Sequence, residues 1–116
     1  MGAGVGGGGG ARIHQGRQDK HIRGSNNYRT ERAQGRNPSV LTSNAQDLLR
    51  TFQNNRRAFN YVKHPNGRIV VDFKRTIGRF FDTKARRFRS TTRVTIHFDG
   101  RGNAHIVPAP PKGFIR

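Results

Sequence analysis

The chain has no cysteine and only six acidic residues among 116. The absence of cysteine excludes disulfide bonds and thiolate metal ligands. Six scattered carboxylates offer no cluster for a Mg²⁺-dependent nuclease, and a zinc site made of histidines alone would lie on a basic surface that repels cations. We therefore expect no metal and no small-molecule cofactor.

Long apolar runs are also missing. No segment approaches the length of a transmembrane span, and the first ten residues are mostly glycine where a signal peptide would be hydrophobic. No long amphipathic basic helix is evident either, so we expect no membrane partner. Residues 1–11 are expected to form a flexible glycine-rich linker and residues 12–116 a single domain, which suggests a module from the end of a longer polypeptide.

Positive charge is abundant. The chain contains 23 Lys and Arg residues, which give a formal net charge of +17. A charge of this size attracts polyanions over a long range, and the basic residues are dispersed from Arg12 to Arg116 rather than confined to one tail. The folded body itself should therefore be positive, and nucleic acid is the expected partner.

The clearest local pattern lies near the C-terminus. Thr91–Phe98 and Ala104–Pro108 have the alternation of two strands, joined by a turn at Asp99–Asn103. If the strands bury their even-numbered apolar residues on one face, the odd-numbered residues share the other face. The simplest register then sets His97 opposite His105, with Cβ atoms about 5 Å apart, beside Arg93 and Thr95.

Helical periodicity is confined to one segment. Ser43 and Gln46 form a possible capping box, and Ala45, Leu48, Leu49 and Phe52 then form one apolar face, so we expect a helix that ends near Asn54 or Asn55. By contrast, residues 11–37 are polar and lack periodicity, with room for at most one short helical turn before Gly24. Such a segment is either disordered or held in place by its polar groups.

Further strands are expected between this helix and the C-terminal hairpin. The candidates are residues 58–62 and 69–73, separated by a Pro-Asn-Gly turn, and residues 77–81, with a basic strand or loop at residues 86–90. The prolines from Pro108 onward should end the sheet. The expected fold is α+β, a small antiparallel sheet of four to five strands with one main N-terminal helix packed on it.

Short motifs are present at Lys20, His21, Ile22, Gly24, Asn27 and Tyr28 and again at Thr91, Thr92, Arg93, His97 and His105. These motifs resemble those of a known family, the bacterial polymorphic toxin type 50 domain. The resemblance spans most of Gln15 to Pro108, and the chain departs from the family in the Arg- and Asn-rich stretch at residues 54–74, in the loop at residues 99–103 and in its arginine load. The resemblance implies a barnase/EndoU/colicin/RelE-like fold. It also implies that the domain is a metal-independent ribonuclease at the C-terminal end of a larger delivered effector.

Metal-free RNA cleavage needs a base for the 2′-hydroxyl proton, an acid for the leaving 5′-oxygen and cations for the phosphoryl oxygens. It leaves a 2′,3′-cyclic phosphate. Imidazole suits both proton transfers because its ordinary pKa is about 6.5. The candidates are therefore His21, His97 and His105 for proton transfer, Lys20 and Arg93 as phosphate clamps, and Thr92, Thr95 or Tyr28 as orienting hydroxyls. The sequence leaves open which imidazole is the acid and which the base, and His14 and His64 are assigned structural roles.

The resemblance also implies RNA as the substrate and a cognate immunity protein, which we expect to be acidic and to cover the histidine face. The toxin would act in the cytoplasm of the target cell. The alternative is a small basic RNA- or DNA-binding protein without catalytic activity, which exposed aromatic residues on a sheet face would favour. Most phenylalanines instead fall at apolar positions, such as Phe98 with Ile96 and Val94, and this favours the nuclease.

Overall fold

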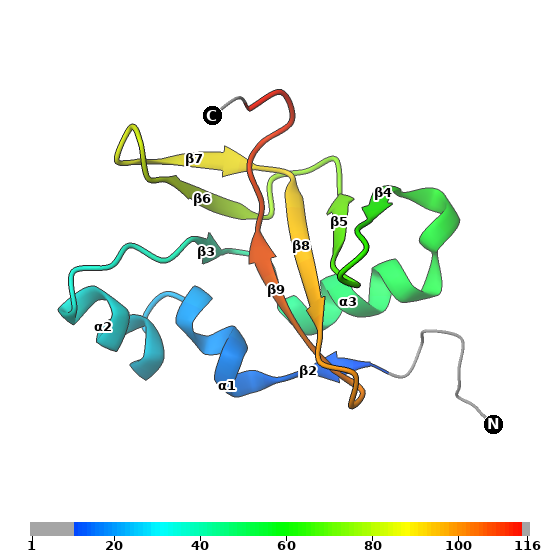
Figure 1. Cartoon of the computed structure of the whole chain (residues 1–116), viewed down its shortest axis with the longest axis horizontal. Coiled ribbons are helices and arrows are strands. Elements are labelled where there is room, and N and C mark those ends of the chain that lie inside the picture. The colour runs from blue at the N-terminus through cyan, green and yellow to red at the C-terminus, as the bar shows by residue number, and fades with distance from the viewer. Residues whose placement is uncertain (1–10, 115–116) are drawn as a thin grey trace.

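The computed structural model describes residues 11–114 (Figure 1). Within that range the strands form one five-stranded sheet, in the order β2-β9-β8-β5-β4, and one three-stranded sheet, in the order β3-β6-β7. The helical elements are α1 (Gln15–Gln18), the 3₁₀ turn η1 (Asp19–His21), α2 (Asn26–Ala33), α3 (Ala45–Asn54) and the 3₁₀ turn η2 (Arg56–Ala58). The strands are β2 (Arg12–Ile13), β3 (Val40–Leu41), β4 (Asn60–Lys63), β5 (Ile69–Asp72), β6 (Gly78–Asp82), β7 (Arg87–Thr91), β8 (Arg93–Phe98) and β9 (Asn103–Pro108). The α+β class is confirmed.

The strands divide between two sheets because the chain turns sharply between β7 and β8. Only Thr92 separates these strands, and its carbonyl accepts a hydrogen bond from Phe73 N at 2.9 Å. The β6-β7 hairpin thereby leaves the plane of the larger sheet and pairs with β3 instead. In the larger sheet β4, β5, β8 and β9 are antiparallel, and β2 adds to β9 in parallel.

Helix α3 covers the apolar face of the five-stranded sheet. Its Leu48, Leu49 and Phe52 are buried in one cluster with the even-numbered side chains of β8 and β9 and their neighbours on β5. The helix ends at Asn54, as the periodicity predicts, but the predicted Ser43 cap is wrong. Asn44 caps the helix by accepting a hydrogen bond from Asp47 N at 2.9 Å, whereas the Ser43 hydroxyl accepts from Arg75 and the Gln46 side chain accepts from Ile13 N.

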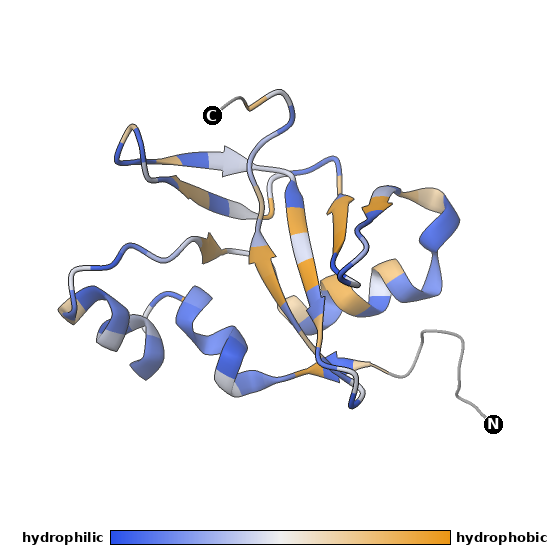
Figure 2. Ribbon diagram, in the orientation of Figure 1, coloured by the Kyte–Doolittle hydropathy of each residue, from blue (hydrophilic) through white to orange (hydrophobic). Residues whose placement is uncertain are grey.

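The polar N-terminal segment is more ordered than its composition suggests. We expected at most one short turn before Gly24, whereas α1 runs directly into η1 and is followed by α2. Helix α2 was missed because none of its residues is buried, so it has no apolar period to detect, and Figure 2 shows both helices as predominantly hydrophilic. Its N-terminus is instead fixed by Ser25, whose hydroxyl accepts from Tyr28 N at 3.1 Å.

Other boundaries differ by one or two residues from those expected. Strand β4 begins at Asn60 because the preceding residues form η2, β6 is shifted to residues 78–82, and the basic stretch at residues 86–90 contributes the strand β7. The expected linker at residues 1–11 lies outside the described residues except for Ala11, which packs against the core. None of the helices between residues 11 and 114 has the length and the apolar character that a membrane span requires.

Candidate active site

The β8-β9 hairpin places two imidazoles side by side. His97 pairs with His105 in the register, as predicted, because the five-residue loop preserves the even-with-even pairing of Phe98 with Ala104. The two rings stack with centroids 4.7 Å apart and planes 9° apart, and both side chains are half-buried. The apolar residues of both strands face α3, so this pair lies on the opposite face of the sheet.

A glutamine attaches the N-terminal helices beside this pair. Gln18 is fully buried, and its amide donates to Ile106 O at 2.7 Å and accepts from Ile106 N at 2.6 Å. The side chain thus takes the place of a strand residue at the edge of β9, beyond the end of the short β2. The polar segment is therefore held in place by its polar groups, and its next residues include Lys20 and His21.

His21 is the third imidazole of the site. It is 7% exposed, and its Nδ1 lies 2.8 Å from Ser39 O. A carbonyl oxygen only accepts hydrogen bonds, so Nδ1 carries the proton and Nε2 of the neutral ring holds a lone pair. This Nε2 is buried and has no hydrogen-bond partner among the described residues. His21, His97 and His105 are called the histidine cluster below.

The cluster favours neutral imidazoles. Burial lowers the pKa of His105 to about 4, and His97, His21, Arg17 and Lys20 add to the effect. Burial also lowers the pKa of His97, with Arg68 and Lys20 contributing. The pKa of His21 is lowered by burial, partly offset by the Ser39 hydrogen bond, with Lys20 and His97 lowering it further. Gln18 is bonded to Ile106, the residue after His105, and His21 follows Gln18 by three residues, so the third ring lies near the stacked pair.

Beside His21 the surface is hollowed. A pocket of about 400 Å³ there is lined by residues that include Lys20, His21, Phe81 and Arg86. It also contains Glu31, whose carboxylate is held by Arg36 at 2.7 Å. The pocket thus combines an aromatic wall with cations next to the buried imidazole.

Not every predicted residue lies in this site. Arg93 shares the sheet face of His97 but is four residues away, about 13 Å at roughly 3.3 Å per residue. Thr92 lies beside Asp72, and Tyr28 lies in the first turn of α2, with no described hydrogen bond from its hydroxyl to the histidine cluster. The structure therefore unites His21, His97, His105 and Lys20, and separates Arg93 from them.

Two cations of the site were missed in the sequence. Arg17 precedes Lys20 and His21 by three and four residues, a spacing that places all three on one helical face. Arg68 directly precedes Ile69, which pairs with Ile96, so Arg68 lies across from His97 on the neighbouring strand. Arg17 could have been found by assuming a helix at residues 15–21, whereas finding Arg68 required the pairing of β5 with β8.

Within residues 11–114, no group of three or more His, Asp or Glu side chains is arranged to hold a metal ion. No curated protein matches the chain in sequence. A family model described as bacterial toxin 50 matches residues 13–108, which include the η1 turn that carries Lys20 and His21 and the whole β8-β9 hairpin. The chain therefore belongs to the bacterial toxin 50 family.

Proposed function

We propose that this toxin domain is a metal-independent endoribonuclease that cleaves RNA by histidine acid-base chemistry and leaves a 2′,3′-cyclic phosphate. The observation that supports it most is the convergence of three imidazoles from two distant segments, within reach of Arg17, Lys20 and Arg68. Buried titratable groups with shifted pKa values next to a pocket are typical of catalytic sites.

His21 is the general base in this proposal. Its Nδ1–H is fixed by Ser39 O, so Nε2 holds the lone pair that takes the proton of a ribose 2′-hydroxyl. Because Nε2 is buried in the free domain, this step requires the side chains around it to move when RNA binds. The lowered pKa keeps the ring neutral at pH 7, as a base requires. The attacking 2′-oxygen then bonds to phosphorus, and the bond from phosphorus to the 5′-oxygen breaks.

The stacked pair of His97 and His105 supplies the acid. Two rings 4.7 Å apart resist being cationic together, so at most one of them is an imidazolium near neutral pH. A phosphodiester bound nearby brings negative charge that raises the pKa values of the pair. The pair then donates its proton to the departing 5′-oxygen, while Lys20, Arg17 and Arg68 stabilise the charge on the phosphoryl oxygens.

The test is cleavage of total RNA in EDTA, with end mapping to detect the cyclic phosphate. His21→Ala, His97→Ala and His105→Ala should each lower the rate by about 10²–10⁴-fold, the range for loss of one acid or base. His64→Ala, which removes an exposed imidazole outside the cluster, is the matched control and should leave the rate unchanged. Full activity in all three cluster variants contradicts the proposal, and RNA binding without cleavage by the unaltered protein supports the nucleic-acid-binding alternative.

The same proposal includes the compartment in which the toxin acts and the protein that neutralises it. A domain delivered as part of a larger effector reaches RNA in the cytoplasm of the target cell, and the producing cell must neutralise its own copy. An acidic immunity protein that covers the histidine cluster would do so, because the domain carries a net charge of +17 and complementary charge accelerates association.

A further inference from the structure

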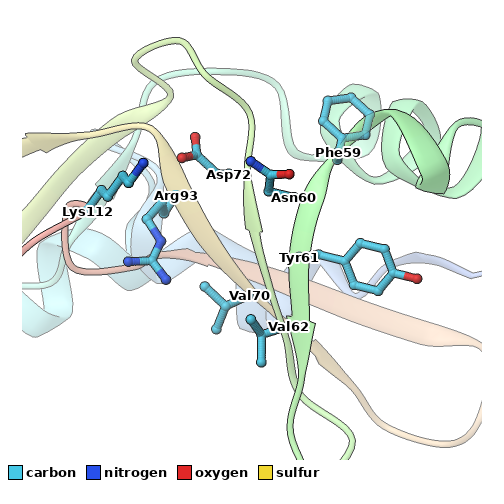
Figure 3. Close-up of a pocket in the computed structure, with 8 residues that line it drawn as sticks. All are labelled: Phe59, Asn60, Tyr61, Val62, Val70, Asp72, Arg93 and Lys112. Carbon is cyan, nitrogen blue, oxygen red and sulfur yellow. The ribbon is translucent and has the colours of Figure 1, made fainter.

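A second hollow, of about 420 Å³, lies on the face of the five-stranded sheet that carries His97 and His105. Figure 3 shows Val62, Val70 and Arg93 close together, with Asn60, Asp72 and Lys112 at one side, while the rings of Phe59 and Tyr61 point away. This hollow is called the Arg93 pocket below.

The register shows why the Arg93 pocket and the histidine cluster share a face. Arg93, Thr95 and His97 alternate along β8 and point to the same side. Across the sheet, Asp72 pairs with Arg93, Val70 pairs with Thr95, and Val62 pairs with Val70. A single strand of nucleic acid that follows β8 for about 13 Å, or four residues, would therefore pass from the cluster to the pocket.

The pocket has an apolar floor and a cationic border. Val62 is 55% exposed, so a large apolar side chain faces solvent in the hollow. Arg93 and Lys112 provide two positive charges, and each helps to lower the pKa of Asp72 against the opposing effect of its partial burial. Two cations against one carboxylate leave the border positive, and the exposed Asn60 adds an amide with both donor and acceptor atoms.

We propose that the Arg93 pocket is a second RNA subsite, which binds a nucleotide of the substrate strand away from the scissile phosphate. The base lies on Val62 and Val70, the Asn60 amide bonds to the edge of the base, and Arg93 and Lys112 contact the phosphate. This inference rests on the proposed ribonuclease function. It assigns Arg93 to substrate binding, and it makes the domain favour chains long enough to reach both sites.

Two variants separate the phosphate contact from the base contact. Lys112→Gln and Asn60→Ala alter exposed side chains, so the fold should survive both. Each should lower kcat/KM for an octaribonucleotide about tenfold, the effect of losing one good polar contact, through KM rather than kcat. Cleavage of a dinucleotide, which is too short to span both sites, should be unchanged. Equal losses on both substrates, or no loss on the octanucleotide, would overturn the subsite.

Binding measured without cleavage keeps the inference testable if the domain proves not to be a nuclease. A labelled octaribonucleotide is titrated onto His21→Ala protein at several salt concentrations. Adding Lys112→Gln should reduce the slope of log K against log salt by about 0.7, the value for one phosphate contact on a single strand, whereas adding Asn60→Ala should weaken binding without changing the slope. Arg50→Gln is the matched charge control, because Arg50 lies on α3 at the opposite face, and an equal slope change there would refute the proposal.

Discussion

Replacement of Gln18 by alanine tests whether one buried amide joins the N-terminal helices to the sheet. The Gln18 side chain is fully buried and satisfies both backbone groups of Ile106, with hydrogen bonds of 2.6 and 2.7 Å. In the Gln18→Ala variant the Ile106 N–H and C=O lose their partner at a point where β2 no longer pairs with β9. Each unsatisfied buried group costs about 1–3 kcal/mol, so unfolding should become easier by at least about 2 kcal/mol.

The consequence should extend to the candidate active site. His21 and Lys20 follow Gln18 within three residues, so a loosened α1 releases the buried imidazole from the neighbourhood of His105. We therefore expect the amide hydrogen of Ile106 to lose protection from exchange, and the pKa of His105 to move back toward its ordinary value because burial and His21 both lower it.

The assay is urea denaturation combined with hydrogen exchange. Gln15→Ala is the matched control on the same helix, because the exposed Gln15 bonds only to Asp19, and it should change the free energy of unfolding by less than about 0.5 kcal/mol. If Gln18→Ala is as stable as that control, or if Ile106 remains protected in it, the amide does not hold the segment and the reasoning fails.

Three further predictions concern pH, packing and partner binding. The pKa of His105 falls from 6.5 to about 4 on folding, so between these two pH values the ring takes up a proton when the domain unfolds. The stability of the domain should therefore decrease as the pH falls from 6.5 to about 4. Solvent screening of the half-buried ring limits this loss of stability to about 1 kcal/mol. His105→Gln should flatten the plot of unfolding free energy against pH, and parallel plots for the variant and the unaltered domain would contradict the prediction. Gly78→Ala should destabilise the fold by about 1–3 kcal/mol in denaturant titrations, because a Cβ there would lie 2.4 Å from Val40 O; unchanged stability would show that β3 and β6 can separate freely. The proposed immunity protein should lose affinity steeply as the salt concentration rises, and it should fail to bind domain that is saturated with RNA; salt-independent binding would argue against a charge-driven interface.

The local features of the site could be predicted because they depend on short-range geometry. The alternation in β8 and β9 determines which side chains share a face, and the loop between them preserves the parity, so the pairing of His97 with His105 follows from the residues alone. The apolar face of α3 is likewise a periodicity of its own sequence. The cap of that helix was misplaced by one residue because the side chains of Ser43 and Gln46 bond to Arg75 and Ile13, which are contacts between distant segments.

The amino-acid sequence by itself determined the basic character of the domain, the α3 helix, the strand parity and the match to the bacterial toxin 50 family over residues 13–108. Only the tertiary structure decided that His21 joins the stacked pair, that Arg68 lies beside it, and that Arg93 belongs to a separate pocket. The physical reason is that each of these depends on contacts between segments far apart in the chain. The Gln18 amide on β9 and the pairing of β5 with β8 have no periodic signature, since a single buried side chain or a strand register is selected by the packing of the whole fold.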